Sequence, residues 1–337
     1  MNILLTGGLG FIGSHTASAL LGRGFNPILL DNLCNSQPST LDRLEQIAEK
    51  RLVFYDVDVR DKNAVHRVLK EQQIHAVMHF AGLKSVAESE SEPLKYYDNN
   101  VTGTISLVQV MQEAGLRKFI FSSSATVYGI PQYLPYDENH PTMPINTYGR
   151  TKLQVEHILR DLAQSDPSWS IACLRYFNPV GAHESGLIGE LPKGIPNNLM
   201  PYVCQVASGK LPYLKIFGDD YETPDGTGQR DYIHVMDLAE GHIATLQFLE
   251  AQSGCHFINL GTGVPYSVRQ LLAAFEKTID RAIDQEIEAR RSGDLPVYYA
   301  TADKAKALLG WEANRSLQSM CDSAWNFHQK SMHANGR

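Results

Sequence analysis

Residues 1–13 read Met-Asn-Ile-Leu-Leu-Thr-Gly-Gly-Leu-Gly-Phe-Ile-Gly, and they decide the fold class. The run before the first glycine is short and apolar, which predicts a buried strand, and the apolar spacing that starts at Phe11 predicts a helix. Gly7, Gly10 and Gly13 punctuate the junction of the two elements. A strand, a glycine turn and a helix start make a phosphate site, because helix N-terminal amides point at the anion and glycines let a pyrophosphate approach closely.

The residue that ends the next apolar run indicates which dinucleotide the site binds. Pro27 to Leu30 ends in Asp31, eighteen residues after Gly13. An acidic side chain at this place accepts hydrogen bonds from ribose hydroxyls and repels a 2′-phosphate. The alternative is that Asp31 merely ends a strand, but its spacing from the glycine turn favours a binding role and therefore NAD over NADP.

Strand and helix patterns then alternate along the first half of the chain. This alternation predicts an α/β fold with a Rossmann-type doubly wound parallel sheet, in which ligands bind at the carboxyl ends of the strands. From about residue 178 the loops become rich in proline and glycine, which predicts a smaller C-terminal α/β substrate-binding lobe. We expect an NAD-binding domain over 1–177, with sequence-distant contributions from the C-terminal half, and a substrate lobe over 178–337. The further apolar runs lie at 52–57, 75–80, 118–122 and 170–174, and the helical stretches around 41–50, 61–71, 93–114 and 146–164.

Composition limits the class of partner and the compartment. A net charge of −7 without a basic run argues against nucleic acid. The five cysteines are odd in number and widely separated, which is typical of reduced thiols and provides no paired spacing for a metal. The N-terminus has no leader pattern, and no apolar run approaches the roughly 20 residues that span a bilayer. We expect a soluble, cytoplasmic protein that binds no metal.

Tyr148 and Lys152 stand four apart in a predicted helix, so they share one face. A free tyrosine has a pKa of about 10 and is a poor general base at neutral pH. A cation about 6 Å away contributes roughly 3 kcal/mol at an effective dielectric of about 20, enough to lower the phenol pKa by about two units. By itself the spacing is also common on solvated helices, and the rest of the chain favours the catalytic interpretation.

Longer strings carry a more specific signal than the glycine turn. They make the chain resemble, nearly end to end, the extended short-chain dehydrogenase/reductase family and, within it, the UDP-galactose 4-epimerases. The strings are Thr-Gly-Gly-Leu-Gly-Phe-Ile-Gly at 6–13, Asp-Asn-Leu-Cys-Asn-Ser at 31–36, His-Phe-Ala-Gly-Leu-Lys at 79–84, Tyr-Tyr-Asp-Asn-Asn at 96–100, Phe-Ser-Ser-Ser-Ala-Thr-Val-Tyr-Gly at 121–129, Leu-Arg-Tyr-Phe-Asn-Pro-Val-Gly-Ala at 174–182, Gly-Ile-Pro-Asn-Asn-Leu at 194–199 and Arg-Asp-Tyr-Ile-His-Val at 230–235.

The resemblance implies reversible, NAD-dependent C4 epimerisation of UDP-galactose and UDP-glucose through a 4-keto sugar, as in galactose metabolism. It implies tightly bound NAD and a homodimer that pairs through the helices at 93–114 and 146–164. The implied catalytic residues are Ser124, Tyr148 and Lys152. The implied cofactor residues are Gly7, Gly10, Phe11, Ile12, Gly13, Asp31, Asn32, Leu33, Cys34, Asn35, Ser36, Asp58, Val59, Phe80, Ala81, Gly82, Leu83, Lys84, Asn99, Ser124, Tyr148, Lys152 and Phe177. The implied substrate residues are Ser124, Tyr148, Asn178, Asn198, Leu199, Phe217, Arg230, Arg291, Asp294 and Tyr298.

The chemistry of the substrate set agrees with this assignment. Arginines bind a diphosphate through forked, charge-assisted hydrogen bonds, an aromatic ring can stack on uracil, and Asp294 can accept from ribose hydroxyls. For Arg291 and Arg230 the alternative is a surface ion pair. A bulky residue at Tyr298 is expected to narrow the sugar pocket and exclude an N-acetyl group.

Three positions depart from the family pattern, and two other functions compete with epimerisation. Leu9 replaces a small residue, Asn146-Thr147 stands where Ser-Pro is common, and Ala289 replaces a proline ahead of the paired arginines. A sugar-nucleotide 4,6-dehydratase shares the first oxidation but carries an Asp-Glu pair where this chain has Ala125-Thr126. A non-enzymatic NAD-sensing protein of the same fold tends to lose the tyrosine or lysine, and this chain keeps both.

Overall fold

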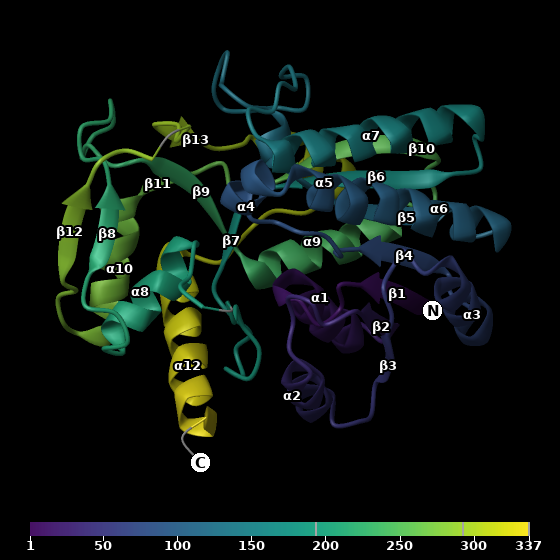
Figure 1. The fold of residues 1–337 in the computed structure, drawn as a ribbon, viewed down its shortest axis with the longest axis horizontal. Helices are drawn as coiled ribbons and strands as arrows, with labels where there is room; N and C mark the ends of the chain where they lie inside the picture. The colour runs from purple at the N-terminus through teal and green to yellow at the C-terminus, as the bar shows by residue number, and fades with distance from the viewer. Residues whose placement is uncertain (193, 292, 336–337) are drawn as a thin grey trace.

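The computed structural model describes residues 1–192, 194–291 and 293–335, with side chains as far as residue 333. A large and a small lobe lie side by side in Figure 1. In the described chain the large lobe contains a seven-stranded sheet in the order β10-β6-β5-β4-β1-β2-β3, with all neighbours parallel. Its strands are β1 Asn2–Thr6, β2 Asn26–Asp31, β3 Val53–Asp56, β4 Ala76–His79, β5 Lys118–Ser124, β6 Ser170–Tyr176 and β10 Gly254–Leu260.

The doubly wound parallel sheet predicted from the sequence is confirmed, and each of the six predicted strands forms within a few residues of its expected place. β10 was not among the predicted strands. Its residues Gly-Cys-His-Phe-Ile-Asn-Leu are only partly buried up to Phe257, so the segment does not read as an apolar run. It adds to the open edge of β6 from the C-terminal half of the chain.

Helices cover both faces of the sheet because successive strand residues point to opposite sides. Leu5 and Met78 pack with one group of helices, and Leu4 and Val77 with the other. Full burial of each such side chain stabilises the fold by about 1.5–3 kcal/mol. The first group is α1 Phe11–Gly22, α2 Ser39–Ala48, α9 Val235–Phe248 and α11 Asp303–Leu309, and the second is α3 Lys62–Gln72, α6 Gly103–Glu113 and α7 Thr147–Ser165.

The helical stretch expected over 93–114 is interrupted. After α4 Val86–Ser91, the chain forms α5 Pro93–Tyr96, a π-helix over Tyr97–Thr102 and then α6. The side chain of Asn100 is buried and binds the loop after β4, as described below. π turns recur where a helix must present a side chain to a functional site.

The small lobe is arranged around β9 Gln229–His234. This strand pairs antiparallel with β11 Pro265–Ser267 and parallel with β13 Val297–Tyr298 and β7 Asn178–Val180. A second parallel pair joins β8 Leu214–Phe217 to β12 Gln285–Glu288. The helices of this lobe are α8 Leu199–Ala207, α10 Val268–Ile279 and α12 Leu317–Asn335. A capping box formed by Ser267 and Gln270 starts α10. In the large lobe, a short 3₁₀ turn at Ala125–Val127 follows β5.

The lobes meet at the carboxyl edge of the parallel sheet. β6 ends at Tyr176 and β7 begins at Asn178, so one residue separates the sheet from the small lobe. α9 and β10 then return to the large lobe, which means that the chain crosses between lobes more than once (Figure 1). The domain boundary between residues 177 and 178 stays a prediction. Among the described residues, no helix is both long and apolar enough to cross a membrane.

Candidate active site

The glycine turn has the shape that a pyrophosphate requires. Gly7 has a φ of 67°, and a Cβ there would lie 2.7 Å from the Ala81 amide nitrogen. A Cβ at Gly13 would lie 2.3 Å from the Gly7 carbonyl oxygen. Gly10 is the N-cap of α1 and no side chain caps the helix, so the amides of its first turn are available to an anion.

Replacing Gly13 with Ala is expected to reduce bound NAD to less than about a tenth of the parent content, since the new methyl group forces the turn open. NAD released on denaturation of protein purified without added cofactor measures this. Gly22→Ala is the matched control, because a Cβ at that end of the same helix meets nothing within 4 Å. A Gly13→Ala protein with full NAD content would contradict the assignment of the turn.

Asp31 joins the glycine turn to the loop that follows β2. Its buried carboxylate accepts hydrogen bonds from the Leu9 amide at 3.1 Å, the Leu33 amide at 3.0 Å and the Ser36 hydroxyl at 2.7 Å. Oδ2 takes part in one of these bonds and retains a lone pair. The predicted ribose contact of Asp31 is therefore compatible with its own-chain contacts. Phe11 and Ile12 begin α1, and Asn32 to Ser36 follow Asp31 in the loop.

Asp58 and Val59 follow β3, next to this loop. The Asp58 carboxylate binds the Arg60 side chain at 2.8 Å and the Asn32 amide group at 2.9 Å. The Arg60 hydrogen bonds are the main reason that the pKa of Asp58 is lowered to about 2. Asp58 is thus anionic at neutral pH, and its contact with the cofactor stays a prediction.

The loop after β4, with Phe80 to Lys84, is held by Asn100, which was not among the predicted site residues. The Asn100 side chain accepts from the Leu83 amide at 2.8 Å and donates to the Leu83 carbonyl at 3.0 Å. Asn100 was missed, although the quoted string at 96–100 contained it. The cofactor contact of Asn99, on the neighbouring position of the π turn, stays a prediction.

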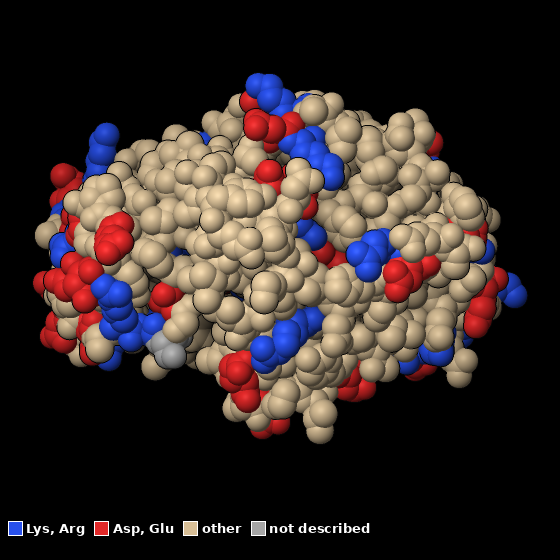
Figure 2. Space-filling view, turned by 90° about the horizontal axis from the view of Figure 1, so that it is seen from above, with Lys and Arg blue, Asp and Glu red and all other residues tan. Residues whose placement is uncertain are grey.

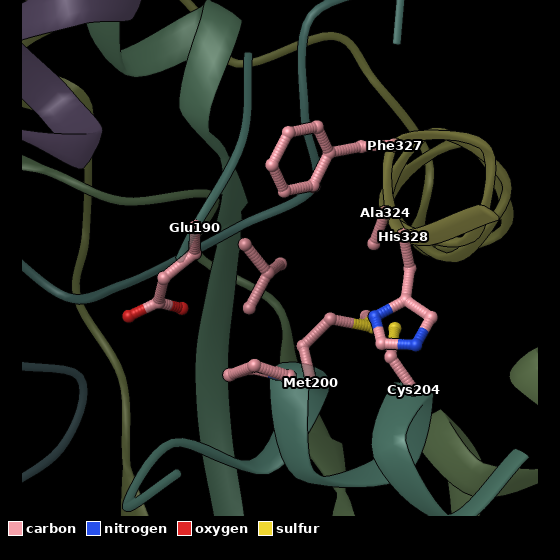
Figure 3. Close-up of a pocket in the computed structure, with 9 residues that line it drawn as sticks. Glu190, Met200, Cys204, Ala324, Phe327 and His328 are labelled. Carbon is pink, nitrogen blue, oxygen red and sulfur yellow. The ribbon is translucent and has the colours of Figure 1, made fainter. Parts of the chain in front are cut away.

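Lys84 points toward the small lobe. Its ammonium lies 3.0 Å from the Glu190 carboxylate, which also accepts from the Asn198 amide group at 2.6 Å. Glu190 therefore connects predicted cofactor and substrate residues, and the sequence offered no motif that would single it out. In Figure 3 the Glu190 carboxylate points away from Phe327 and His328. The cavity between α8 and α12 in that view measures about 30 Å³, far too little for a sugar nucleotide.

Three side-chain contacts place the start of α7. Asn146 is the N-cap and accepts from the Gly149 amide at 2.7 Å. Ser89 and Glu90 of α4 accept from the Tyr148 and Thr147 amides at 3.1 and 2.6 Å. Tyr148 thus lies in the first turn and Lys152 one turn later, as the spacing predicts.

Lys152 is buried at the carboxyl end of β5. Its ammonium donates to the Ser122 carbonyl at 2.7 Å and lies 4.8 Å from the Phe121 ring centroid and 5.8 Å from that of Tyr148. Burial lowers the pKa of Lys152 to about 8, and the charge of Glu156 opposes this shift. The lysine is still mostly cationic at neutral pH.

The prediction that Lys152 by itself lowers the pKa of Tyr148 is wrong for the protein alone. Burial raises the pKa of the phenol, and a hydrogen bond with Ser124 lowers it to a smaller extent. The reason is desolvation: the phenolate is removed from water, while the ammonium is engaged with a carbonyl. The expected juxtaposition of Ser124, Tyr148 and Lys152 is nevertheless found.

The predicted substrate residues form two groups in the small lobe. Arg230 pairs with Tyr298 across β9 and β13, and its guanidinium donates to the Leu295 carbonyl at 2.8 Å and lies 3.5 Å from Asp294. The Arg291 guanidinium stacks 3.8 Å from the centroid of Phe217. Arg291 thus covers one face of the Phe217 ring. Asn178 begins β7, Asn198 is the N-cap of α8 and Leu199 is its first residue.

Tyr298 extends toward the catalytic group. Its ring lies 5.0 Å from Tyr136 and 5.4 Å from Phe177, between centroids, and burial together with the nearby tyrosines, Tyr148 among them, raises the pKa of its phenol. The Tyr298 hydroxyl is buried and has no hydrogen-bond partner within the described chain. An unsatisfied buried hydroxyl costs about 1–3 kcal/mol, so its position suits a ligand that supplies the missing bond.

The residues after Ser124 bear on the dehydratase alternative. Ala125 is buried, and the Thr126 hydroxyl donates to the Ser124 hydroxyl at 2.9 Å. The expected acidic pair of that alternative is replaced by a methyl group and a hydroxyl that orients Ser124. The site can therefore transfer a proton at Tyr148 but has no carboxylate at these two positions to expel a hydroxyl group.

Comparison with known proteins agrees with this geometry. The family model described as GDP-mannose 4,6 dehydratase matches residues 4–324. A UDP-glucose 4-epimerase of Neisseria meningitidis serogroup C is 53% identical over 326 residues, which cover 96% of each chain.

Two crystal structures share the whole fold. UDP-glucose 4-epimerase from Stenotrophomonas maltophila, with bound NAD and formylated UDP-arabinopyranose, matches with a TM-score of 0.97 and 48% identity over 99% of each chain. The enzyme from Bifidobacterium longum, in complex with NAD+ and UDP, matches with a TM-score of 0.95 and 51% identity over 98% of this chain and 99% of its own. The glycine turn, the Ser124-Tyr148-Lys152 group and these full-length similarities together show that the chain belongs to the UDP-glucose 4-epimerase family of extended short-chain dehydrogenases/reductases.

Proposed function

We propose that the protein interconverts UDP-galactose and UDP-glucose by reversible epimerisation at C4, with a tightly bound NAD. The observation that carries this proposal is the Ser124-Tyr148-Lys152 group at the carboxyl edge of a sheet whose first turn fits a pyrophosphate. A full-length relative at 53% identity is a UDP-glucose 4-epimerase, and two similar structures contain NAD.

The cofactor would occupy the edge formed by the ends of β1, β2 and β4. The Gly7 to Gly13 turn would hold the pyrophosphate, Asp31 the adenosine ribose, and Lys152 the nicotinamide ribose. When bound, NAD accepts hydride from the sugar C4 and returns it. Its positive nicotinamide charge also opposes the effect of burial on the Tyr148 pKa. Retention of the cofactor between the two hydride transfers makes it a prosthetic group.

The protein residues move the proton. Tyr148, as phenolate, removes the proton from the C4 hydroxyl, and Ser124 hydrogen-bonds the reacting oxygen. A 4-keto sugar results. If the keto sugar turns its other face to the cofactor before hydride returns, C4 is inverted and Tyr148 gives the proton back. Arg230 and Arg291 would anchor the diphosphate while the sugar turns.

Incubation of the purified protein with UDP-galactose tests the function. Appearance of UDP-glucose supports epimerisation, a keto-deoxy sugar supports dehydration, and no conversion by NAD-loaded protein supports a binding role. The NAD content of protein purified without added cofactor should be close to one per chain. Loss of the cofactor on simple dialysis would contradict its proposed role.

Tyr298 is the residue that we expect to limit the size of the sugar substituents that the site accepts. We expect the protein to turn over UDP-N-acetylgalactosamine at less than about a hundredth of the rate for UDP-galactose, because an added N-acetyl group in a filled pocket meets steric overlap. Tyr298→Ser should raise this ratio at least about tenfold. Tyr133→Ser, at a tyrosine that is 45% exposed, is the control and should leave the ratio unchanged. Comparable turnover of both sugars by the parent would contradict the assignment of Tyr298.

We further propose a homodimer in which two helical segments of each copy, the segment 93–114 from α5 to α6 and the helix α7, form a four-helix bundle. Leu94 in α5 is 82% exposed, and such a large apolar side chain on this surface suits burial by a partner. Light scattering during size-exclusion chromatography tests the mass, and Leu94→Glu should shift it toward that of one chain. An unchanged dimer mass in the variant would argue against this surface.

We place the protein in the cytoplasm and expect neither nucleic acid nor membrane as a partner. Cys173, Cys204, Cys255 and Cys321 form no disulfide within the described chain, which is typical of a reducing compartment. On the face shown in Figure 2, acidic and basic side chains are interspersed rather than gathered into one basic area. Fractionation of cells that express a tagged protein tests the compartment.

A further inference from the structure

Glu156 and Arg175 form a buried ion pair that the chemistry above does not use. Arg175 Nε lies 2.9 Å from Glu156 Oε1, and Arg175 Nη2 lies 2.7 Å from Oε2, a bidentate arrangement. The side chains are 5% and 1% exposed. Burying two charges costs several kcal/mol per ion before pairing, and apolar replacements are often equally stable. Stability alone is therefore a weak explanation for the pair.

The pair is connected to both elements that carry the catalytic group. Glu156 lies on α7, one turn after Lys152. Its Oε1 also accepts from the Ser123 hydroxyl at 2.6 Å. Ser123 lies between Ser122, whose carbonyl accepts from Lys152, and Ser124. Because strand side chains alternate, Ser123 faces α7 as Phe121 does.

Arg175 extends the connection to the rest of the sheet. Its Nη1 donates to the Tyr128 hydroxyl at 3.0 Å, and that hydroxyl donates to Asn259 Oδ1 at 2.6 Å. The guanidinium also lies 4.8 Å from the Tyr128 ring centroid and 5.1 Å from that of Phe257. We call Ser123, Tyr128, Glu156, Arg175 and Asn259 the buried network. It joins β5, α7, β6 and β10 to the turn after Ser124.

We propose that Glu156 and Arg175 are positioning residues for the reaction, and that they act by holding the carboxyl end of β5 against α7. This places the Ser122 carbonyl on Lys152 and the Ser124 hydroxyl beside Tyr148. The inference rests on the proposed epimerase function. A shift of the strand end of about 1 Å would separate groups that must meet within hydrogen-bond distance.

Charge balance gives the proposal a second, measurable consequence. Glu156 raises the pKa of Lys152 against the effect of burial, and Arg175 balances the Glu156 charge. Without the carboxylate, Lys152 loses the charge that raises its pKa while Arg175 remains cationic in the same interior, so the pKa of Lys152 falls further and the lysine loses its proton at lower pH. The other ionisable groups in these surroundings are His79 from β4, Cys173 and Tyr176 from β6, Tyr148 from α7 and Glu138 from the loop after Tyr136.

Glu156→Gln tests the inference in the full-length, NAD-loaded protein. We expect kcat to fall at least about tenfold while KM for UDP-galactose stays within about twofold, with the alkaline limb of the kcat profile about one pH unit lower. Asp237→Asn is the matched control. Asp237 lies on α9, which covers the opposite face of the sheet, and its buried carboxylate is paired with Arg315. That variant should lose stability but keep the parent kcat and pH profile.

Two further variants separate geometry from charge and remain informative if Glu156→Gln does not fold. Ser123→Ala keeps both charges and should lower kcat at least about threefold without moving the alkaline limb. The double variant Glu156→Gln/Arg175→Gln should return the limb to within about 0.3 pH units of the parent while kcat stays low. Parent kcat in Ser123→Ala, or parent kcat and limb in folded Glu156→Gln, would overturn the inference. Failure of the proposed function is distinct, because the parent protein itself would then not interconvert the sugars.

Discussion

Replacing Tyr148 with Phe is expected to lower kcat for UDP-galactose at least about a thousandfold. The phenol oxygen is the only group of Tyr148 that the substitution removes, and it is the proposed proton acceptor. Because Tyr148 is only partly exposed and burial raises the pKa of its phenol, bulk water cannot easily replace the missing base. Initial rates at saturating UDP-galactose, normalised to bound NAD, measure the loss.

The pH dependence of the same variant provides a second readout. A general base is active in its deprotonated form, so parent activity should rise with pH through the Tyr148 pKa in the loaded enzyme, and this limb should vanish in Tyr148→Phe. Tyr133→Phe, which removes an exposed phenol oxygen, is the control and should retain the parent rate. A Tyr148→Phe protein with more than about a tenth of the parent kcat would exclude Tyr148 from proton transfer.

Replacing Lys152 with Met is expected to lower kcat at least about a hundredfold and to reduce NAD retention. Met has a similar length and no charge, so the variant removes the ammonium while filling most of its space. Loss of the cation removes one of the positive charges that favour the Tyr148 phenolate in the loaded enzyme. The variant's kcat and its NAD content after purification measure the two effects.

The stability of Lys152→Met should change in the opposite direction to its activity. The pKa of Lys152 is about 8 in the folded protein, against an ordinary lysine value of 10.5, so the folded state binds this proton more weakly than the unfolded chain does. Below pH 8 the buried ammonium therefore costs about 3 kcal/mol, and this cost disappears as pH rises toward 10.5. Tm at pH 7 should be at least as high as that of the parent, with the difference shrinking at pH 9.

Lys306→Met is the control for the lysine substitution, because that ammonium is 62% exposed and far from the proposed chemistry. It should leave kcat, NAD content and Tm near the parent values. A Lys152→Met protein that is active and much less stable than the parent would show that the lysine is structural. The two readouts together thus separate a catalytic role from a packing role.

Most of the fold was predictable because its determinants are local. The glycine turn, the short apolar runs and the helical spacing each lie within one element, and the parallel sheet follows from their alternation. β10 was missed because its upstream half is only partly buried and it joins the sheet edge 78 residues after β6 ends, from Tyr176 to Gly254. The π turn before α6 was missed because it depends on the contact of Asn100 with the Leu83 loop.

The candidate site divides in the same way. Motif positions such as Gly13, Tyr148 and Lys152 could be named from spacing and resemblance. Glu190, which links Lys84 to Asn198, and the buried pair Glu156 and Arg175 could not, because their partners are remote in sequence. The prediction that Lys152 by itself lowers the Tyr148 pKa was also wrong for the protein alone, since the direction depends on how much water the folded chain removes from the phenol.

The sequence by itself determined the order of strands and helices, the dinucleotide turn and the stacking of Tyr148 with Lys152, because backbone preference and side-chain period act over a few residues. Only the tertiary structure decided which charges are buried, which carbonyl accepts the hydrogen bond from Lys152 and which side chains connect the two lobes. Those outcomes depend on desolvation and on contacts between distant segments, and neither is contained in a local pattern.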